Sequence, residues 1–390
     1  CENLTSVEFP DKLETIDQNA FSFCFALRTI QLNENLTTIG NSCFQHCETL
    51  EALQFNEKLI NAPYNGFYCC IGLKSVIFNK DLEIINSYCF QDCTSLEKVV
   101  FNESLITIGS CAFQHCESLE SVQFNEKLET INTRAFDGCF SMSGLLNMTN
   151  SIRTIGDYAF RDCRQVSSIH FTEYYSISMG SYVFQNCFGL KGVLTLPDYI
   201  YSIPTGCFSN CTNIEMLNFS GNIYSINSYA FQNCTSLLSL SVPEGCSSVG
   251  SNSFEFCTSL KSISFHPTFA NINQKAFQHC YSLETIDWNS STPSINKGAF
   301  QFCHKLEQLS IPRGIKTLSD SAFLNCSNLV TADLGNVTSI KNSTFAYCTK
   351  LENINIPETV TEVGNYSFYY CSAAKSYNLP VELKEGKLNY

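Results

Sequence analysis

Cysteines recur in this chain at almost constant intervals. Phenylalanine stands three residues before each cysteine of the series after the first, and leucine usually stands three residues after it. Seventeen of the 23 cysteines form the series, with steps of 22 to 24 residues: Cys1, Cys24, Cys47, Cys70, Cys93, Cys116, Cys139, Cys163, Cys187, Cys211, Cys234, Cys257, Cys280, Cys303, Cys326, Cys348 and Cys371. A fixed period of this length predicts a stack of similar structural units.

The repeating unit indicates a short strand followed by a turn. It reads C-x2-L-x2-[VIL]-x-[FL]-[NP]-x2-L-x2-I-x3-[AC]-F-x2. The part L-x2-V-x-F alternates at its end and is rich in β-branched and aromatic residues, which is typical of a strand, and Asn or Pro then marks a turn. The part A-F-x2-C does not alternate and predicts a tight turn or a single helical turn. One unit buries too little apolar surface to offset the entropy of ordering it, so neighbouring units must share a core.

This pattern resembles the BspA-like class of leucine-rich repeats, for instance at Leu260–Phe265 and Leu306–Pro312. The resemblance implies a solenoid of about 16 to 17 coils, with one long parallel sheet on the concave face and short helical or irregular turns on the convex face. It also implies a non-catalytic role, because similar proteins are typically surface proteins of bacteria and protist parasites that adhere to host proteins or to other cells.

We expect one solenoid over residues 1–390, divided by the regularity of its repeats. Residues 1–138 and 211–370 keep a regular spacing, whereas the three 24-residue steps fall within 139–210. Residues 371–390 lose the pattern and end in a charged tail, as a C-terminal cap would.

The repeated apolar positions predict the core, in which the cysteines form a ladder of buried thiols that pack as small apolar groups. Disulfides between neighbouring repeats are an alternative, but the Cβ atoms of stacked cysteines point in parallel directions and lie too far apart for good bridges. A strained disulfide between Cys69 and Cys70 is a second alternative. The predicted structural residues are exemplified by two repeats: Phe113, Cys116, Leu119, Phe277, Cys280 and Leu283.

The segment AFQHCESL places His115 beside Cys116, which raises the question of a metal site. The position before the cysteine varies widely between repeats, and zinc needs about four ligands that converge from different directions. We therefore expect no metal and no cofactor. The motifs of serine hydrolases, zinc proteases and nucleotide-binding enzymes are absent from the sequence, so no catalytic residue is predicted.

The net charge of −13 has no Lys/Arg cluster to offset it, which excludes binding driven by nucleic-acid phosphates. Partner proteins are then expected on the exposed sheet, where most solvent-facing positions are short or polar, as at Glu307 and Ser310. Exposed apolar groups and tyrosines on a polar solenoid are candidate anchors. In the middle repeats these predicted partner-binding residues are Ile77, Val100, Leu146, Tyr174, Tyr175, Leu194, Tyr199, Tyr201, Met216 and Leu238. The alternative is that the longer repeats adjust curvature and fold these side chains inward.

The leading hypothesis is a cell-surface or secreted adhesion module for partner proteins, including host extracellular-matrix or cell-surface proteins. An intracellular scaffold of the same fold and a self-assembling structural protein are the alternatives. The first strand, around Leu4–Phe9, has no cap before it, so we also expect a homodimer that pairs through this edge.

Overall fold

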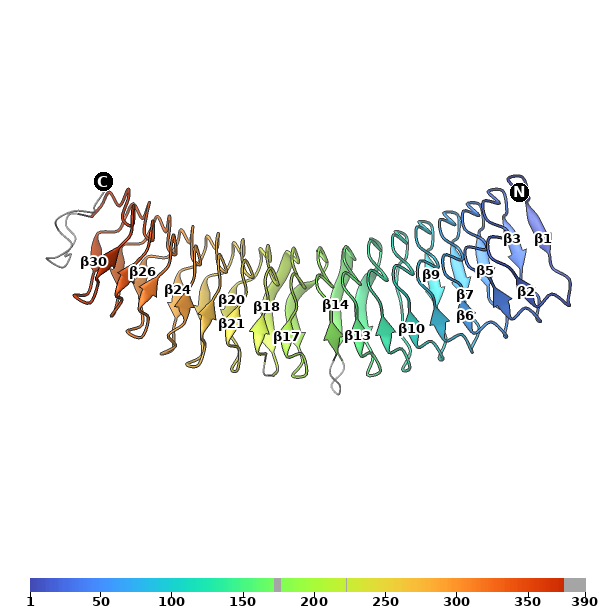
Figure 1. The fold of residues 1–390 in the computed structure, drawn as a ribbon, viewed down its shortest axis with the longest axis horizontal. Coiled ribbons are helices and arrows are strands. Elements are labelled where there is room, and N and C mark those ends of the chain that lie inside the picture. The colour runs from blue at the N-terminus through green and yellow to red at the C-terminus, as the bar shows by residue number, and fades with distance from the viewer. Residues whose placement is uncertain (172–176, 222, 375–390) are drawn as a thin grey trace. The chain divides into compact units, whose positions relative to one another are not determined.

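The computed structural model describes residues 1–171, 177–221 and 223–374 as stacked coils of parallel strands (Figure 1). By its internal contacts the chain divides into two compact units, Cys1–Lys191 (unit 1) and Gly192–Tyr390 (unit 2). The division falls inside the predicted irregular segment 139–210, and the single continuous solenoid over 1–390 stays a prediction.

The coils contribute strands to two rows, and the first row corresponds to the predicted strand segment; in the coil that begins at Cys116 this row is reduced to an isolated bridge between Lys98 and Ser121. In unit 1 its strands are β1 (Ser6–Glu8), β3 (Thr29–Gln31), β5 (Ala52–Gln54), β7 (Ser75–Ile77), β9 (Lys98–Val100), β12 (Ser143–Met148) and β14 (Gln165–Phe171). In unit 2 they are β16 (Lys191–Leu196, which begins at the last residue of unit 1), β18 (Asn213–Phe219), β20 (Ser239–Ser241), β22 (Ser262–Ser264), β24 (Thr285–Asp287), β26 (Gln308–Ser310), β28 (Thr331–Asp333) and β30 (Asn353–Asn355).

The second row consists of two-residue strands centred on the Thr-Ile part of the repeat. In unit 1 they are β2 (Thr15–Ile16), β4 (Thr38–Ile39), β6 (Asn61–Ala62), β8 (Ile84–Ile85), β10 (Thr107–Ile108), β11 (Thr130–Ile131), β13 (Thr154–Ile155) and β15 (Ser178–Met179). In unit 2 they are β17 (Ser202–Ile203), β19 (Ser225–Ile226), β21 (Ser248–Val249), β23 (Asn271–Ile272), β25 (Ser294–Ile295), β27 (Thr317–Leu318), β29 (Ser339–Ile340) and β31 (Glu362–Val363).

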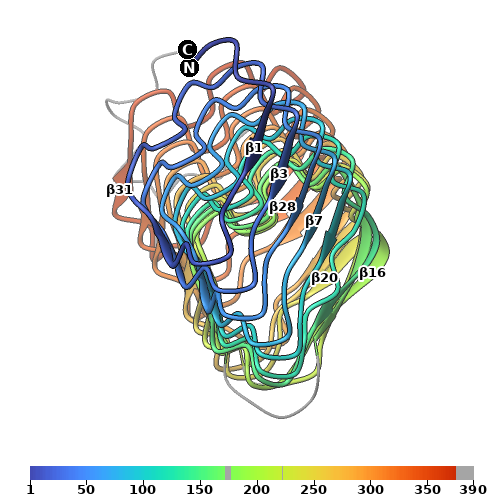
Figure 2. The same cartoon turned by 90° about the vertical axis from the view of Figure 1, so that its right-hand side faces the viewer.

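Pairing within each row is parallel and advances by one repeat. Thr107 pairs with Thr130 in the second row, and Val76 pairs with Val99 in the first. Within unit 2, β31 lies on a different side of the coil from β20 and β28 (Figure 2). The predicted solenoid is thus confirmed in each unit, while the expectation of a single sheet missed the second row.

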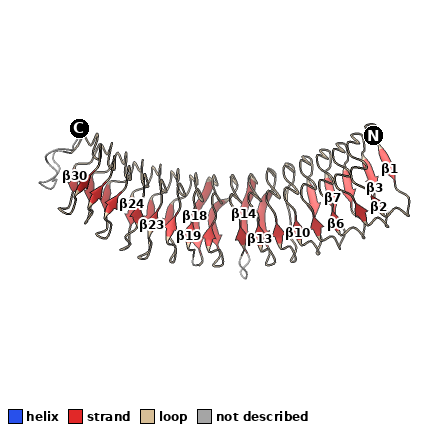
Figure 3. Cartoon of the chain, viewed as in Figure 1, coloured by secondary structure: helices blue, strands red, loops and turns tan. Residues whose placement is uncertain are grey.

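The turn that carries the core phenylalanine is not helical, and no helix occurs in the described part of the chain (Figure 3). Cys111 and His115 flank this turn with φ of 56° and 57°, in the left-handed region. The amide of Phe113 donates to the carbonyl of Ala135, and that of His115 to Asp137, both at 2.8 Å. The turn amides therefore bond to the next repeat, and of the two predicted alternatives the tight turn holds in the described residues and the helical turn does not.

The core of each unit is a stack of phenylalanine rings flanked by cysteine and leucine. The ring of Phe113 lies 5.4 Å from that of Phe90 and 5.3 Å from that of Phe136, with nearly parallel planes. Complete burial is found for all the predicted structural residues, Phe113, Cys116, Leu119, Phe277, Cys280 and Leu283.

Asparagines after the first-row strands of unit 1 join successive coils through their side chains. The Asn79 amide donates to the carbonyls of Asn56 and Leu59, and Asn125 repeats the pattern on Asn102 and Leu105. Because a buried carbonyl left without a donor is costly, these amides fix the position of each turn on the preceding one. In the sequence these asparagines are recognisable as turn signals only.

Replacing Phe113 with Ala should lower the free energy of unfolding by about 3–5 kcal/mol, because it opens a cavity in a continuous ring stack. Phe23→Ala is the matched control, since Phe23 is 45% exposed, and it should cost less than about 1 kcal/mol. Urea unfolding followed by circular dichroism measures both values. A Phe113→Ala protein as stable as the control would contradict the packing described here.

The buried thiols should make the fold sensitive to alkali. Burial raises the pKa of Cys43, Cys47 and Cys326 from an ordinary value of 9.0 to about 12. Above pH 9 the unfolded chain releases thiol protons that the folded chain retains, so stability is complete below pH 9 and falls as pH rises towards 12. Each such thiol contributes up to about 1.4 kcal/mol per pH unit in this window.

We expect the melting temperature to fall steadily above about pH 9, together with the onset of thiol reaction with an aromatic disulfide reagent. A Cys43→Ala, Cys326→Ala double variant should lose less stability between neutral and alkaline pH than the parent. Rapid reaction of most thiols in the folded protein at neutral pH would contradict the burial.

Candidate functional site

Several predicted partner-binding residues do lie at the surface. Ile77 and Val100 are exposed at the ends of β7 and β9 and pair with each other in the sheet of unit 1. In unit 2, Met216 on β18 is 49% exposed, and Leu238 and Tyr201 are exposed as well. Tyr174 and Tyr175 lie outside the described residues.

Three of the predicted surface residues are buried instead. Leu146 is 3% exposed and Leu194 is 5% exposed, whereas their neighbours Leu145 and Val193 are 58% and 57% exposed. Gly144 and Gly192 adopt φ of 81° and 70°, and the pairing register of β12 shifts just after Gly144. A shift of one residue exchanges the two faces of a strand, which turns Leu146 and Leu194 into the core.

Tyr199 is the third residue that was predicted to be exposed and is buried. It is buried next to Ile200, which occupies the aliphatic core position of its repeat, and burial raises the pKa of the Tyr199 phenol to about 12. Tyr201 instead stacks on Tyr224 with ring centroids 5.9 Å apart, and both rings are exposed. The inward-folding alternative therefore holds for some residues of the middle repeats and not for others.

Of the exposed apolar residues of unit 2, Met216 was predicted from the sequence and Val193 was not. β16 and β18 are neighbouring strands, and the amide of Ser220 donates to the carbonyl of Leu196. Val193 on β16 and Met216 on β18 are both exposed. The signal that could have identified Val193 is the glycine before it, since glycine inside a strand often marks a bulge.

His115 and Cys116 point to different surroundings. The Cys116 thiol donates to the Phe90 carbonyl at 3.2 Å, whereas Nδ1 of His115 lies 2.8 Å from Oδ1 of Asp92. Within the described ranges, no three His, Cys, Asp or Glu side chains come together as ligands for a metal ion. The same residues include no helix with the length and apolar character that crossing a membrane requires.

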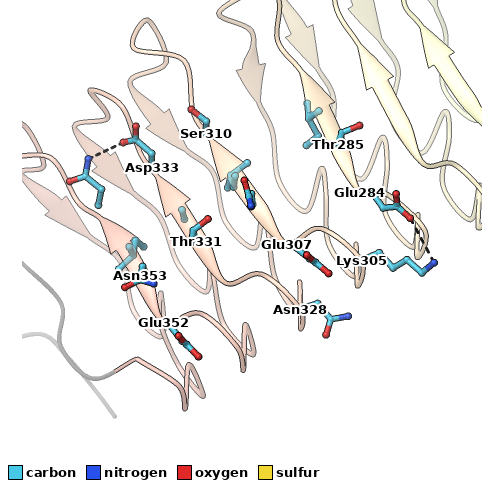
Figure 4. A pocket seen from close by; sticks show the side chains of 16 residues that line it. Glu284, Thr285, Lys305, Glu307, Ser310, Asn328, Thr331, Asp333, Glu352 and Asn353 are labelled. Carbon is cyan, nitrogen blue, oxygen red and sulfur yellow. Dashed lines mark hydrogen bonds and ion pairs between the residues drawn. The ribbon is translucent and has the colours of Figure 1, made fainter.

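A polar groove of about 1250 Å³ lies on the exposed side of β24, β26, β28 and β30 in unit 2 (Figure 4). Its walls carry amide, hydroxyl and carboxylate groups at equivalent positions of successive repeats. The polar side chains that line it are Glu284, Thr285, Lys305, Glu307, Gln308, Ser310, Asn328, Thr331, Asp333, Glu352, Asn353 and Asn355.

The fold positions these groups through the alternation of short strands. In β26 the central Leu309 is buried, and Gln308 and Ser310 on either side are exposed. The next strand, β28, repeats this arrangement because Gln308 pairs with Thr331. Glu307 and Ser310 were predicted from the sequence as solvent-facing polar residues, whereas the hollow that four repeats form together was not predicted.

Charge in the groove is mostly negative. Lys305 is the one cation among the described lining residues, and its Nζ lies 3.8 Å from Oε1 of Glu284. Asp333 accepts a hydrogen bond from the Asn355 side chain at 3.0 Å. The side chains of Glu307 and Glu352 form no ion pair within the part of the chain that the structure describes.

Two bacterial proteins are among the solved structures that resemble the chain. A leucine-rich repeat protein from Bacteroides ovatus ATCC 8483 is 24% identical, with a TM-score of 0.73 over 83% of this chain and 85% of that one. A leucine rich cell surface protein from Faecalibacterium prausnitzii A2-165 is 20% identical, with a TM-score of 0.51 over 84% of this chain and 92% of that one. At these identities the likeness shows the fold alone. A search of curated proteins gave no match.

The family is shown by the sequence itself. Six overlapping copies of the BspA type Leucine rich repeat region match residues 1–97, 83–193, 145–259, 177–306, 224–336 and 270–387. Together they extend over nearly the whole chain. This protein belongs to the BspA-type leucine-rich repeat family.

Proposed function

We propose that the chain is a non-catalytic protein-interaction module that binds a partner protein through the exposed first-row sheet of unit 2. The observation that carries the proposal is the polar groove across β24, β26, β28 and β30. Neighbouring strands lie about 4.8 Å apart, so the groove extends about 14 Å across four strands. A broad, open hollow of this kind suits a polypeptide segment better than a small molecule, which prefers an enclosed and mostly apolar pocket.

A cell-surface or secreted location is part of the same proposal. It is supported by family membership and by the F. prausnitzii protein of similar fold, which is named a cell surface protein. Adhesion to host matrix or cell-surface proteins is the role we favour over an intracellular scaffold. Self-association through β1 stays a prediction.

Filling the groove with a large side chain should block binding. Thr331→Trp places an indole at the centre of the groove, on β28, and we expect saturable binding to at least one of a panel of purified extracellular-matrix proteins to weaken roughly tenfold or more. Surface plasmon resonance measures the affinities.

Ser75→Trp is the matched control, because Ser75 lies on β7 of unit 1 at the same position of its repeat, five residues after the cysteine. It should bind like the parent protein, and both variants should keep the parent melting temperature. Equal binding by the parent and Thr331→Trp would exclude the groove as the contact surface.

The stacked and exposed rings of Tyr201 and Tyr224, which precede the second-row strands β17 and β19, form a second proposed contact surface. Desolvated tyrosines often dominate binding energy, and loss of one costs about 2 kcal/mol or more, roughly thirtyfold in affinity. Tyr201→Ala should show such a loss in the same assay, whereas Tyr64→Ala, exposed in unit 1, should not. Unchanged binding by Tyr201→Ala would remove this surface from the proposal.

A further inference from the structure

Three of the four acidic side chains that line the groove occupy one position of the repeat, and Asp333 is the exception. Glu284, Glu307 and Glu352 each stand four residues after the cysteine of their repeat, and Val330 fills the position between the last two. Equivalent positions on neighbouring parallel strands are about 4.8 Å apart, so like charges there repel each other. A cationic ligand would relieve this repulsion.

The same position in unit 1 is balanced by lysines and arginine. The position holds Glu51, Lys74, Glu97 and Glu120 in successive repeats. Lys98, the first residue of β9, comes directly after Glu97 and adds a positive charge there. Glu51 also lies 3.9 Å from the Arg28 guanidinium. Unit 2 has Lys261 at this position, one repeat before Glu284, but the four repeats that form the groove have no cation there, so the groove is more acidic than the equivalent surface of unit 1.

The arrangement of the carboxylates indicates what kind of cation fits. They are spread along the groove, and no three of them converge on one point in the described residues, so they do not form a cage for a metal ion. Several separate positive charges on one chain match this spacing better. Arg313, in a small hollow beside Asp287 at the edge of the groove, is a cation near the site in addition to Lys305.

Amide side chains fill the space between the carboxylates. Gln308, Asn328 and Asn353 line the groove, and each side chain carries both a donor and an acceptor. Such groups can hydrogen-bond to the backbone of an extended peptide, while the carboxylates pair with its lysine or arginine side chains. Long, flexible basic side chains tolerate a mismatch between the spacing of the peptide and that of the repeats.

We propose that the groove of unit 2 binds an extended segment of a partner protein that is rich in lysine or arginine. This inference rests on the proposed function and names the chemical class of the partner at the same site.

The probe is a fluorescein-labelled peptide of alternating Lys and Ser, ten residues long, and the readout is fluorescence anisotropy with the full chain at low and at moderate salt. We expect saturable binding that weakens as salt rises, because exposed charge pairs are screened. The same peptide with Glu in place of Lys should not bind. A lack of saturable binding by the Lys peptide at low salt would overturn the proposal.

Glu307→Gln with Glu352→Gln should weaken peptide binding roughly tenfold. The matched control is Glu97→Gln with Glu120→Gln in unit 1, which removes the same net charge from the same repeat position and should change affinity less than about twofold. An equal loss in both double variants would mean that the peptide responds only to the overall charge of −13. If spermine binds as tightly as the peptide, the groove recognises a free polyamine and not a polypeptide, and the proposal is wrong.

Failure of this inference can be told apart from failure of the proposed function. If Thr331→Trp weakens binding to a matrix protein while the Lys peptide does not bind, the groove is a contact surface for a partner of other chemistry. If the peptide binds but Thr331→Trp leaves matrix-protein binding unchanged, the groove recognises cations and the adhesive surface lies elsewhere.

Discussion

The carbonyl oxygen of the core phenylalanine joins each coil to the next. That of Phe113 accepts the backbone N–H of Cys116 at 3.2 Å within its own turn and the thiol of Cys139, also at 3.2 Å, from the following repeat. Cysteine suits this place because it is small, packs as an apolar group and still carries a weak donor. The periodic cysteine and its phenylalanine partner therefore belong to one contact, repeated along each unit.

Strong periodicity is why much of the fold could be predicted from the sequence. The Phe113 and Cys116 positions recur in every repeat, so their burial followed without structural data. The second row of strands could not be recognised, because two residues such as Thr107 and Ile108 show no alternation. The choice between a tight turn and a helical turn stayed open for another reason: the left-handed conformation at His115 is accompanied by hydrogen bonds to the next repeat, which no local pattern reveals.

The candidate surfaces were less predictable than the core. Leu146 was assigned to the exposed face by counting from the cysteine, and the register shift after Gly144 reversed that assignment. The groove depends on neighbours one, two and three repeats away, so Glu307 and Glu352 gain meaning only when the coils are stacked. Their common repeat position was visible in the sequence, but the balance of charge around them required the register.

The joint at the phenylalanine carbonyl has the same chemistry at each junction between regular repeats. Unequal recombination in a coding sequence, if it keeps this register, adds or removes a whole coil. The same contact between the cysteine thiol and the phenylalanine carbonyl then forms on either side of the change. A lineage can in this way lengthen, shorten or reshuffle the outward-facing sheet without redesigning its interior. Variation in the number of coils is then a source of new specificities that does not require substitutions in the core.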